Sequence, residues 1–170
     1  GTADIGLIYR KNEKTVEGYV DADWANCTSD RRSYTGYAFI LSGCPIAWES
    51  RKQKTVALSS TEAEYMALTE AAKQATYLRH FLLELGFNTL AEIKVFCDNN
   101  GARKLAENPI FHSRTKHIDV RHHYVREALN RGELTIEHVS SSEMVSDILT
   151  KSVPAHKLRK CISILGLSRI

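Results

Sequence analysis

The hydrophobic period of this chain changes near residue 58, and that change restricts the folds open to it. Up to that point the apolar residues form short runs rich in Tyr, Phe, Val, Ile and Thr, which is the pattern of β-strands. From residue 59 to 85 the chain is rich in Ala, Glu, Leu and Lys. Short loops join the early runs, so we expect sequential antiparallel strands packed against one long helix. The apolar stripe of that helix consists of Met66, Leu78, Phe81, Leu82 and Leu85.

The other elements follow from the same two periods. Ser59 followed by Glu62 has the spacing of a capping box that begins the long helix, and Gly86 is placed to end it. A turn is expected at 42–45, and the short apolar run at 93–97 resembles a buried parallel strand. The order predicts an α/β domain with one sheet and helices on its faces. We expect strands at 5–10, 16–24, 34–41, 46–50 with 55–58, 93–97 and 134–139, and shorter helices at 99–107, 115–130, 143–151 and 156–165.

The size and charge of the chain suit one domain that could meet nucleic acid. Its 170 residues are enough for a sizeable core. The net charge of +3 and the pI near 8.7 permit a nucleic-acid partner without demanding one. The four cysteines form no C-x-x-C pair, which disfavours a zinc ribbon and favours a reducing, intracellular setting. No apolar run approaches the roughly 20 residues that span a bilayer, so we expect no membrane partner. The first residue is Gly1 and not Met, so we expect a piece of a longer protein.

Four acidic residues lie in separate segments that only a fold could bring together. Asp21 ends one apolar run and Asp98 ends another, Glu64 lies near the start of the long helix, and Asp147 lies in a late segment. Clustered carboxylates repel each other, and bound Mg²⁺ is their usual partner. Taken singly, each has another explanation: an Asp after a strand often forms a turn or caps a helix, and a Glu in a first helical turn is usually solvated. Together they are typical of a two-metal phosphodiester hydrolase.

Five collinear motifs resemble the ribonuclease H domain of copia-type LTR retrotransposon polyproteins. The resemblance runs from about residue 5 to the end of the chain and implies a mixed five-stranded sheet, three strands antiparallel and two parallel, with helices on both faces. It also implies that the four metal-binding acids of the family map, in order, onto Asp21, Glu64, Asp98 and Asp147. The motifs are YVDADWA (19–25), KTVALSSTEAEY (54–65), VFCDNN (95–100), TKHIDVR (115–121) and DILTK (147–151).

The resemblance implies an activity, a cofactor and partners as well. The activity is cleavage of the RNA strand of RNA–DNA hybrids during reverse transcription, with two Mg²⁺ ions for which Mn²⁺ could substitute. The partners are the hybrid and the polymerase part of the same polyprotein, in the cytoplasm and in a virus-like particle. Residues 1–15 would then connect to the polymerase through a short strand, and residues 16–170 would form the ribonuclease H domain. One alternative is a catalytically weak or silent hybrid-binding module, and another is an integrase-like nuclease or an exonuclease on the same fold.

The identity of the first acid and the role of His138 each have an alternative. Asp21 and Asp23 share a strand face, so either could be the first acid. The small Ala22 after Asp21 fits the family pattern, whereas Trp24 after Asp23 fits it poorly, so we favour Asp21. His138 is the candidate for the catalytic histidine that many cellular ribonucleases H carry before the last acid, and a purely structural role at a strand end is equally open.

Polar and basic residues near the acids are candidates for substrate binding. Short polar side chains suit the shallow minor groove of an RNA-containing duplex, although helix capping explains some of them. These candidates are Ser60, Thr61, Asn99 and Asn100. A basic cluster could bind phosphate or could be a solvated hairpin tip, and it consists of Arg51, Lys52 and Lys54.

The histidine-rich segment 112–131 has three possible roles. It could bind phosphate as a basic helix, or be solvated only. A zinc site is disfavoured, because residues spaced by five do not align on one helix face. The histidines concerned are His112, His117, His122 and His123.

Overall fold

The computed structural model describes residues 4–11, 14–107 and 119–169, and within it five strands form one mixed sheet of order β4-β3-β2-β5-β6. The strands β2 (Val16–Ala22), β3 (Tyr34–Leu41) and β4 (Cys44–Lys52) are antiparallel. The strands β5 (Ile93–Cys97) and β6 (Thr135–His138) run parallel to β2 on its other side. The prediction of three antiparallel and two parallel strands is confirmed.

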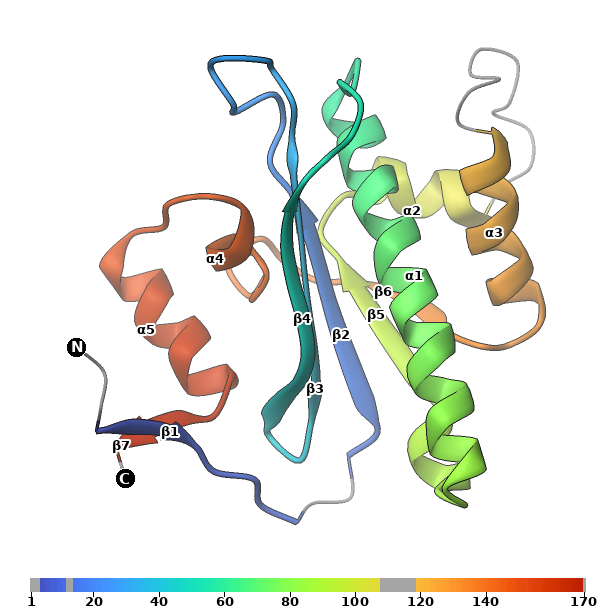
Figure 1. The fold of residues 1–170 in the computed structure, drawn as a ribbon, viewed down its shortest axis with the longest axis vertical. Coiled ribbons are helices and arrows are strands. Elements are labelled where there is room, and N and C mark those ends of the chain that lie inside the picture. Colours follow the sequence, from blue (N-terminus) through green and yellow to red (C-terminus); the bar gives the residue numbers. More distant parts are fainter. Residues whose placement is uncertain (1–3, 12–13, 108–118, 170) are drawn as a thin grey trace.

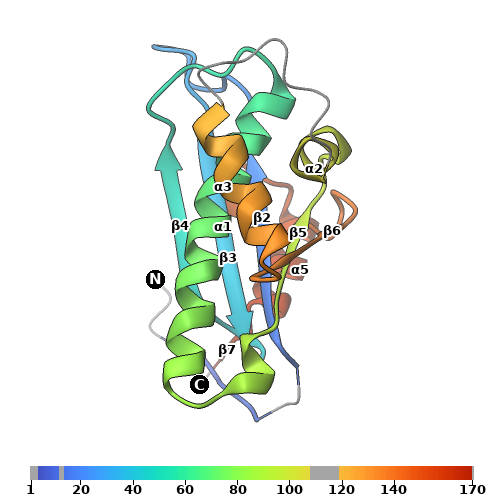
Figure 2. The same cartoon turned by 90° about the vertical axis from the view of Figure 1, so that its right-hand side faces the viewer.

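Helices cover both faces of the sheet (Figure 1). The long α1 (Ser60–Glu84), with α2 (Asn100–Glu107) and α3 (Asp119–Asn130), lies on one face, as the turned view in Figure 2 also shows. The short α4 (Asp147–Thr150) and α5 (Ala155–Ile164) lie on the other. Each face has its own apolar core, one built around Val20, Phe39 and Leu68 and a smaller one built around Ile40 and Val145.

The start of α1 shows why the helix begins where the sequence predicts. The Ser59 hydroxyl accepts a hydrogen bond of 3.1 Å from the backbone N–H of Glu62, and the Glu62 carboxylate accepts one of 2.8 Å from the N–H of Leu58. The first bond satisfies one of the amides that a helix start leaves without partners, and the second ties the residue before the cap to the first turn. Five alanines are fully buried along the helix, so α1 packs close to the sheet: Ala63, Ala67, Ala71, Ala72 and Ala75.

The predicted apolar stripe of α1 was wrong in part. Met66, Leu78 and Leu82 are buried, but Phe81 and Leu85 are 46% and 54% exposed. The alanines carry the contact with the sheet instead, because small side chains allow the helix backbone to approach β2. The prediction counted only large apolar residues, and it therefore placed exposed side chains on the buried face of the helix.

Other boundaries also differ from the predictions. Residues 55–58 form a loop, since β4 already ends at Lys52, and the turn is confined to Ser42 and Gly43. The helix predicted at 143–151 contains only Asp147–Thr150. The helix predicted at 115–130 begins at Asp119 among the residues described, and 115–118 lie outside them.

A two-stranded ribbon joins the two ends of the described chain. The strand predicted at 5–10 is β1 (Ile5–Leu7), and it pairs antiparallel with β7 (Leu167–Arg169), which the sequence did not predict. A three-residue strand has too few residues to show a period, and its partner lies more than 150 residues away, as the pairing of Ile5 with Arg169 shows. The short 3₁₀ helix at Asn88–Ala91 was missed for the same lack of local signal.

Candidate metal centre

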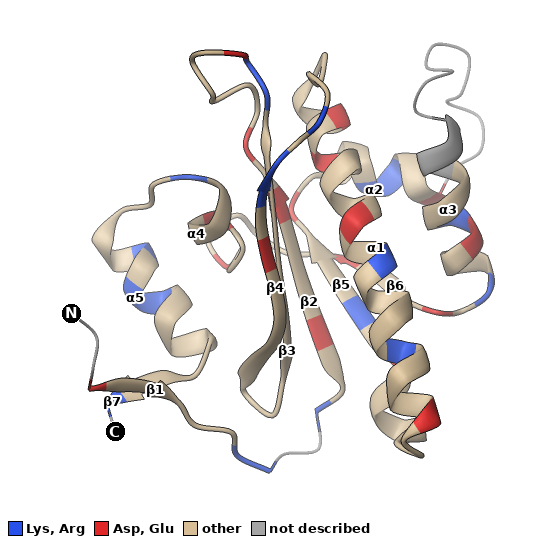
Figure 3. Ribbon diagram, in the orientation of Figure 1, with Lys and Arg blue, Asp and Glu red and all other residues tan. Residues whose placement is uncertain are grey.

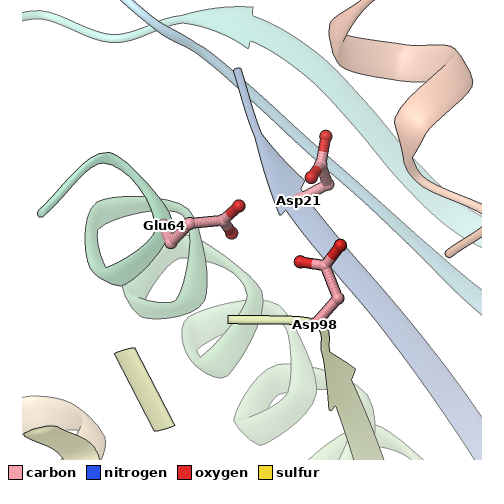
Figure 4. A group of neighbouring side chains, drawn as sticks. All are labelled: Asp21, Glu64 and Asp98. Carbon is pink, nitrogen blue, oxygen red and sulfur yellow. The ribbon is translucent and has the colours of Figure 1, made fainter. Parts of the chain in front are cut away.

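Three of the four predicted acids meet at one edge of the sheet (Figure 4). Asp21 lies near the end of β2, Asp98 directly follows β5, and Glu64 lies on the first part of α1. Because β2 and β5 are parallel neighbours, their carboxyl ends reach the same edge. One carboxylate oxygen from each of the three residues lies within 4.8 Å of the others. This acid trio is the only group of this kind among the described residues.

Burial makes the charged form of two of these acids unfavourable. Asp21 is 1% exposed and Glu64 is 6% exposed. Burial, opposed by Lys151 and Thr150 and increased by neighbouring carboxylates, raises the pKa of Asp21 to about 6. Burial, with the charges of Asp21 and Asp98, raises the pKa of Glu64 to about 9. Raised pKa values of this kind are typical of buried carboxylates that lie close to one another.

The donor set of the trio fits a hard divalent cation. The buried Oε2 atom of Glu64 has no hydrogen-bond partner in the protein. A buried acceptor without a partner is unfavourable, and a cation would provide the missing interaction. Carboxylate oxygens are the ligands that Mg²⁺ and Mn²⁺ prefer. Asp21, Glu64 and Asp98 are therefore able to hold such an ion.

Asp147 joins this centre through lysine side chains. It begins α4, is 2% exposed, and forms an ion pair with the ammonium group of Lys157 on α5. Lys151 lies between Asp147 and Asp21: its Nζ atom is 3.0 Å from Oδ1 of Asp147 and 3.4 Å from both carboxylate oxygens of Asp21. The predicted acids thus form two groups that share Asp21, one with Glu64 and Asp98 and one with Asp147.

Asp23 has a different environment from Asp21. Its Oδ1 atom accepts a hydrogen bond from the backbone N–H of Tyr34, and its own N–H donates to the Tyr34 carbonyl at 3.2 Å. Both bonds close the start of the β2–β3 connection. Asp23 is outside the acid trio, and its contacts provide a structural role. The choice of Asp21 as first ligand remains a prediction that this geometry favours.

Several residues that support the acids were not predicted. The Ser141 hydroxyl donates a 2.6 Å hydrogen bond to Oδ2 of Asp98, and the Thr150 hydroxyl donates to Oδ2 of Asp21. Lys157 also donates to the Ser141 carbonyl at 2.6 Å, which connects the two groups of acids. Thr150 and Lys151 lie inside the DILTK motif and could have been found there. Ser141 and Lys157 carry no sequence signal, because only packing brings them to the site.

The predicted histidines lie at the edge of the site or outside the described part. His138 is exposed at the end of β6, opposite Cys97 in the strand pairing and so one position from Asp98. Its catalytic role remains a prediction. His123 is exposed on α3. The described part of the structure leaves out His112, His117 and the side chain of His122. The zinc and phosphate hypotheses for that segment therefore remain open.

The predicted minor-groove residues lie at two neighbouring helix starts. Ser60 is exposed and Thr61 is half-buried in the first turn of α1. Asn99 caps α2, because its Oδ1 atom accepts a 3.0 Å hydrogen bond from the N–H of Ala102, and Asn100 is the exposed first residue of that helix. A Cβ atom at Gly101 would lie 2.9 Å from the Thr61 hydroxyl, so the two helix starts are in contact.

The basic cluster lies at the end of β4 and in the loop after it, not at a hairpin tip (Figure 3). Arg51 pairs with Glu49 at 2.8 Å and with Glu70 at 3.2 Å, and Lys52 pairs with Asp30 at 3.3 Å. Lys54 is exposed. A pocket of about 280 Å³ lies among them, lined by Thr35, Arg51, Lys52, Gln53, Lys54, Met66, Glu70 and Lys73.

Solved structures with the same fold identify the class of domain. LC11-RNase H1, isolated from compost, superposes with a TM-score of 0.61 over 80% of this chain and 92% of its own, at 14% sequence identity. The same enzyme in complex with an RNA/DNA hybrid gives a TM-score of 0.56 over 80% of this chain and 94% of its own, at 14% identity. The fold is that of ribonuclease H.

Comparison with known sequences shows which family of proteins the chain is similar to. The retrovirus-related Pol polyprotein from transposon TNT 1-94 of Nicotiana tabacum is 43% identical over 98% of this chain, and that from transposon RE1 of Arabidopsis thaliana is 37% identical over the whole of it. The chain spans 12% of the length of each. It is a homologue of one segment of retrotransposon Pol polyproteins, and the predicted resemblance is confirmed. No family model matches the chain. Among the described helices, none has the length and apolar character needed to cross a membrane.

Proposed function

We propose that this domain is a Mg²⁺-dependent endonuclease that hydrolyses the RNA strand of RNA–DNA hybrids during reverse transcription. The observation that carries the proposal is the acid trio, with Asp147 joined to it through Lys151, at the edge of a ribonuclease H sheet. The structural neighbour solved with an RNA/DNA hybrid and the Pol polyprotein homologues support the substrate and the setting. That setting includes the polymerase part of the same polyprotein as partner, in the cytoplasm and in a virus-like particle.

The side chains of this domain would bind and orient the reacting groups. Two bound Mg²⁺ ions, or Mn²⁺ as a substitute, would supply activation of a water molecule and stabilisation of the leaving oxygen. Asp21, Glu64 and Asp98 would hold one ion, and Asp21 with Asp147 would hold the other. The hydrogen bonds from Thr150 to Asp21 and from Ser141 to Asp98 orient two of these carboxylates in advance. The products would be a 3′-hydroxyl and a 5′-phosphate.

The substrate would approach over the two helix starts. The shallow minor groove of the hybrid would meet short polar side chains there, which can recognise the 2′-hydroxyl groups of RNA. The basic cluster at the end of β4 would contact phosphates outside the reacting bond. The residues assigned to these contacts are Ser60, Thr61, Asn99 and Asn100 for the groove and Arg51, Lys52 and Lys54 for the phosphates.

One experiment tests the activity and separates it from a silent hybrid-binding role. The purified domain is incubated with labelled RNA–DNA hybrid, RNA–RNA and DNA–DNA duplexes, with Mg²⁺ and with chelator. We expect Mg²⁺-dependent cleavage of the RNA strand in the hybrid only, and its loss in Glu64→Gln. Tight hybrid binding without cleavage, at any Mg²⁺ or Mn²⁺ concentration, would leave the binding-module alternative.

A further inference from the structure

The ammonium group of Lys151 lies between two carboxylates of the candidate metal centre. It contacts both oxygens of Asp21 at 3.4 Å and Oδ1 of Asp147 at 3.0 Å. Both aspartates are almost fully buried, at 1% and 2% exposure. Two buried carboxylates this close to one cation would repel each other strongly without it. Lys151 therefore provides, in the protein itself, the positive charge that this half of the centre requires.

Lys157 differs from Lys151 in how firmly it is held. The side chain of Lys157 is 15% exposed and donates both to Asp147 and to the Ser141 carbonyl, so it is fixed between α4, α5 and the loop before α4. The side chain of Lys151 is 39% exposed. If Lys151 moved away, Asp147 would keep Lys157 as its partner. Asp21 would keep its hydrogen bond from Thr150 but would lose its cation.

An open pocket adjoins Lys151, which is one of its lining residues. It has a volume of about 610 Å³ and lies on the α4 side of the sheet. The polar residues that line the pocket with Lys151 come from several segments, and they are Asn26, Tyr34, Ser50, Thr150 and Ser152.

We propose that Lys151 is an exchangeable counter-cation, which holds Asp21 and Asp147 together while no metal is bound and withdraws into the neighbouring pocket when a divalent cation binds between them. The inference rests on the proposed function, because it assumes that the centre binds Mg²⁺. Lys151 then lowers the affinity for one of the ions, since the incoming cation must displace a charge already in place. In return, the metal-free domain keeps its acids together.

The test compares Mg²⁺ binding by titration calorimetry in variants that differ at one charge. Lys151→Met and Lys151→Gln remove the charge, and Lys151→Arg keeps it. Lys160→Met is the matched control, because Lys160 pairs at 3.4 Å with the exposed Glu143, away from the acids. We expect about tenfold tighter Mg²⁺ binding in the two neutral variants, the effect of one partly screened unit charge. Lys151→Arg and Lys160→Met should bind no more tightly than the wild type.

Thermal unfolding gives a second readout that does not depend on activity. In chelator, the neutral variants should unfold at a lower temperature than the wild type, and added Mg²⁺ should remove the difference. Unchanged or weaker Mg²⁺ binding in both folded neutral variants would overturn the inference, and so would an equal gain in Lys151→Arg. If the wild type cleaves hybrid while the neutral variants gain no affinity, only the role of Lys151 is wrong. If the wild type neither binds Mg²⁺ nor cleaves hybrid, both proposals are overturned.

Discussion

Replacing Glu64 by Gln should stabilise the metal-free protein and reduce the stability that it gains from Mg²⁺. Glu64 is 6% exposed, one of its carboxylate oxygens has no partner, and its pKa is raised from 4.5 to about 9. A raised carboxyl pKa means that the folded protein holds the proton more tightly than the unfolded chain. Stability is therefore full below about pH 4.5 and decreases as the pH rises towards 9.

The size of the effect follows from the pKa difference. At pH 7 the unfolded chain has lost the proton and the folded protein retains it, which lowers the free energy of unfolding by at most about 3 kcal/mol at 1.4 kcal/mol per pKa unit. Gln has the same shape and no charge, so Glu64→Gln should regain much of this energy. For a chain of this length the gain corresponds to roughly 5–10 °C in the unfolding temperature.

The assay is thermal unfolding followed by circular dichroism, in chelator and in excess Mg²⁺, from pH 5 to pH 8. In chelator, the advantage of Glu64→Gln should grow with pH. In Mg²⁺ the wild type should gain stability, whereas the variant, which has lost a ligand, should gain less. Glu84→Gln is the control, since Glu84 is exposed at the end of α1. A variant that is less stable than the wild type in chelator, or an advantage independent of pH, would refute the burial argument.

Three further experiments test the remaining assignments. Asp98→Asn should reduce hybrid cleavage at least a hundredfold while the fold stays as stable as the wild type, which single-turnover kinetics and unfolding curves check together. Asp21→Asn should abolish cleavage. Asp23→Asn should retain measurable turnover, because Asn at position 23 can still accept the hydrogen bond from the backbone N–H of Tyr34. The opposite result would exchange the roles of the two aspartates. Replacing the basic cluster by Ala should weaken hybrid binding in low salt and reduce the salt slope by up to about three, one for each phosphate contact, and an unchanged slope would exclude those contacts. The residues replaced are Arg51, Lys52 and Lys54.

The parts of the fold that were predicted correctly are those with a strong local pattern. The strands β2, β3 and β5 and the helix α1 all show their period over five or more residues, and the cap at Ser59 is visible in the sequence. The missed parts depend on distant partners. The β1–β7 ribbon exists only because the two chain ends meet, and residues 55–58 have strand-like composition but no neighbouring strand to pair with.

The residues of the candidate metal centre also differ in whether a local sequence pattern predicts them. Asp21 and Asp98 could be predicted to meet, because each lies at the end of an apolar run and the two runs were expected as strands of one sheet. Ser141 and Lys157, which contact Asp98 and Asp147, could not be predicted, because tertiary packing places their segments. In that packing, Cys161 and Leu165 of the α5 segment lie with Ile40 and Val145 in the smaller core.

The packing of α5 on the smaller core affects both the stability of the fold and the metal centre. The C-terminal helix supplies a cation to Asp147, which is almost fully buried and would be very unfavourable there without a partner. Loosening α5 would therefore remove the fixed partner of one acid and, through Ser141, the contact to another. Substitutions in the smaller core should thus weaken the metal centre from a distance, while the acid trio itself, held by β2, β5 and α1, stays in place.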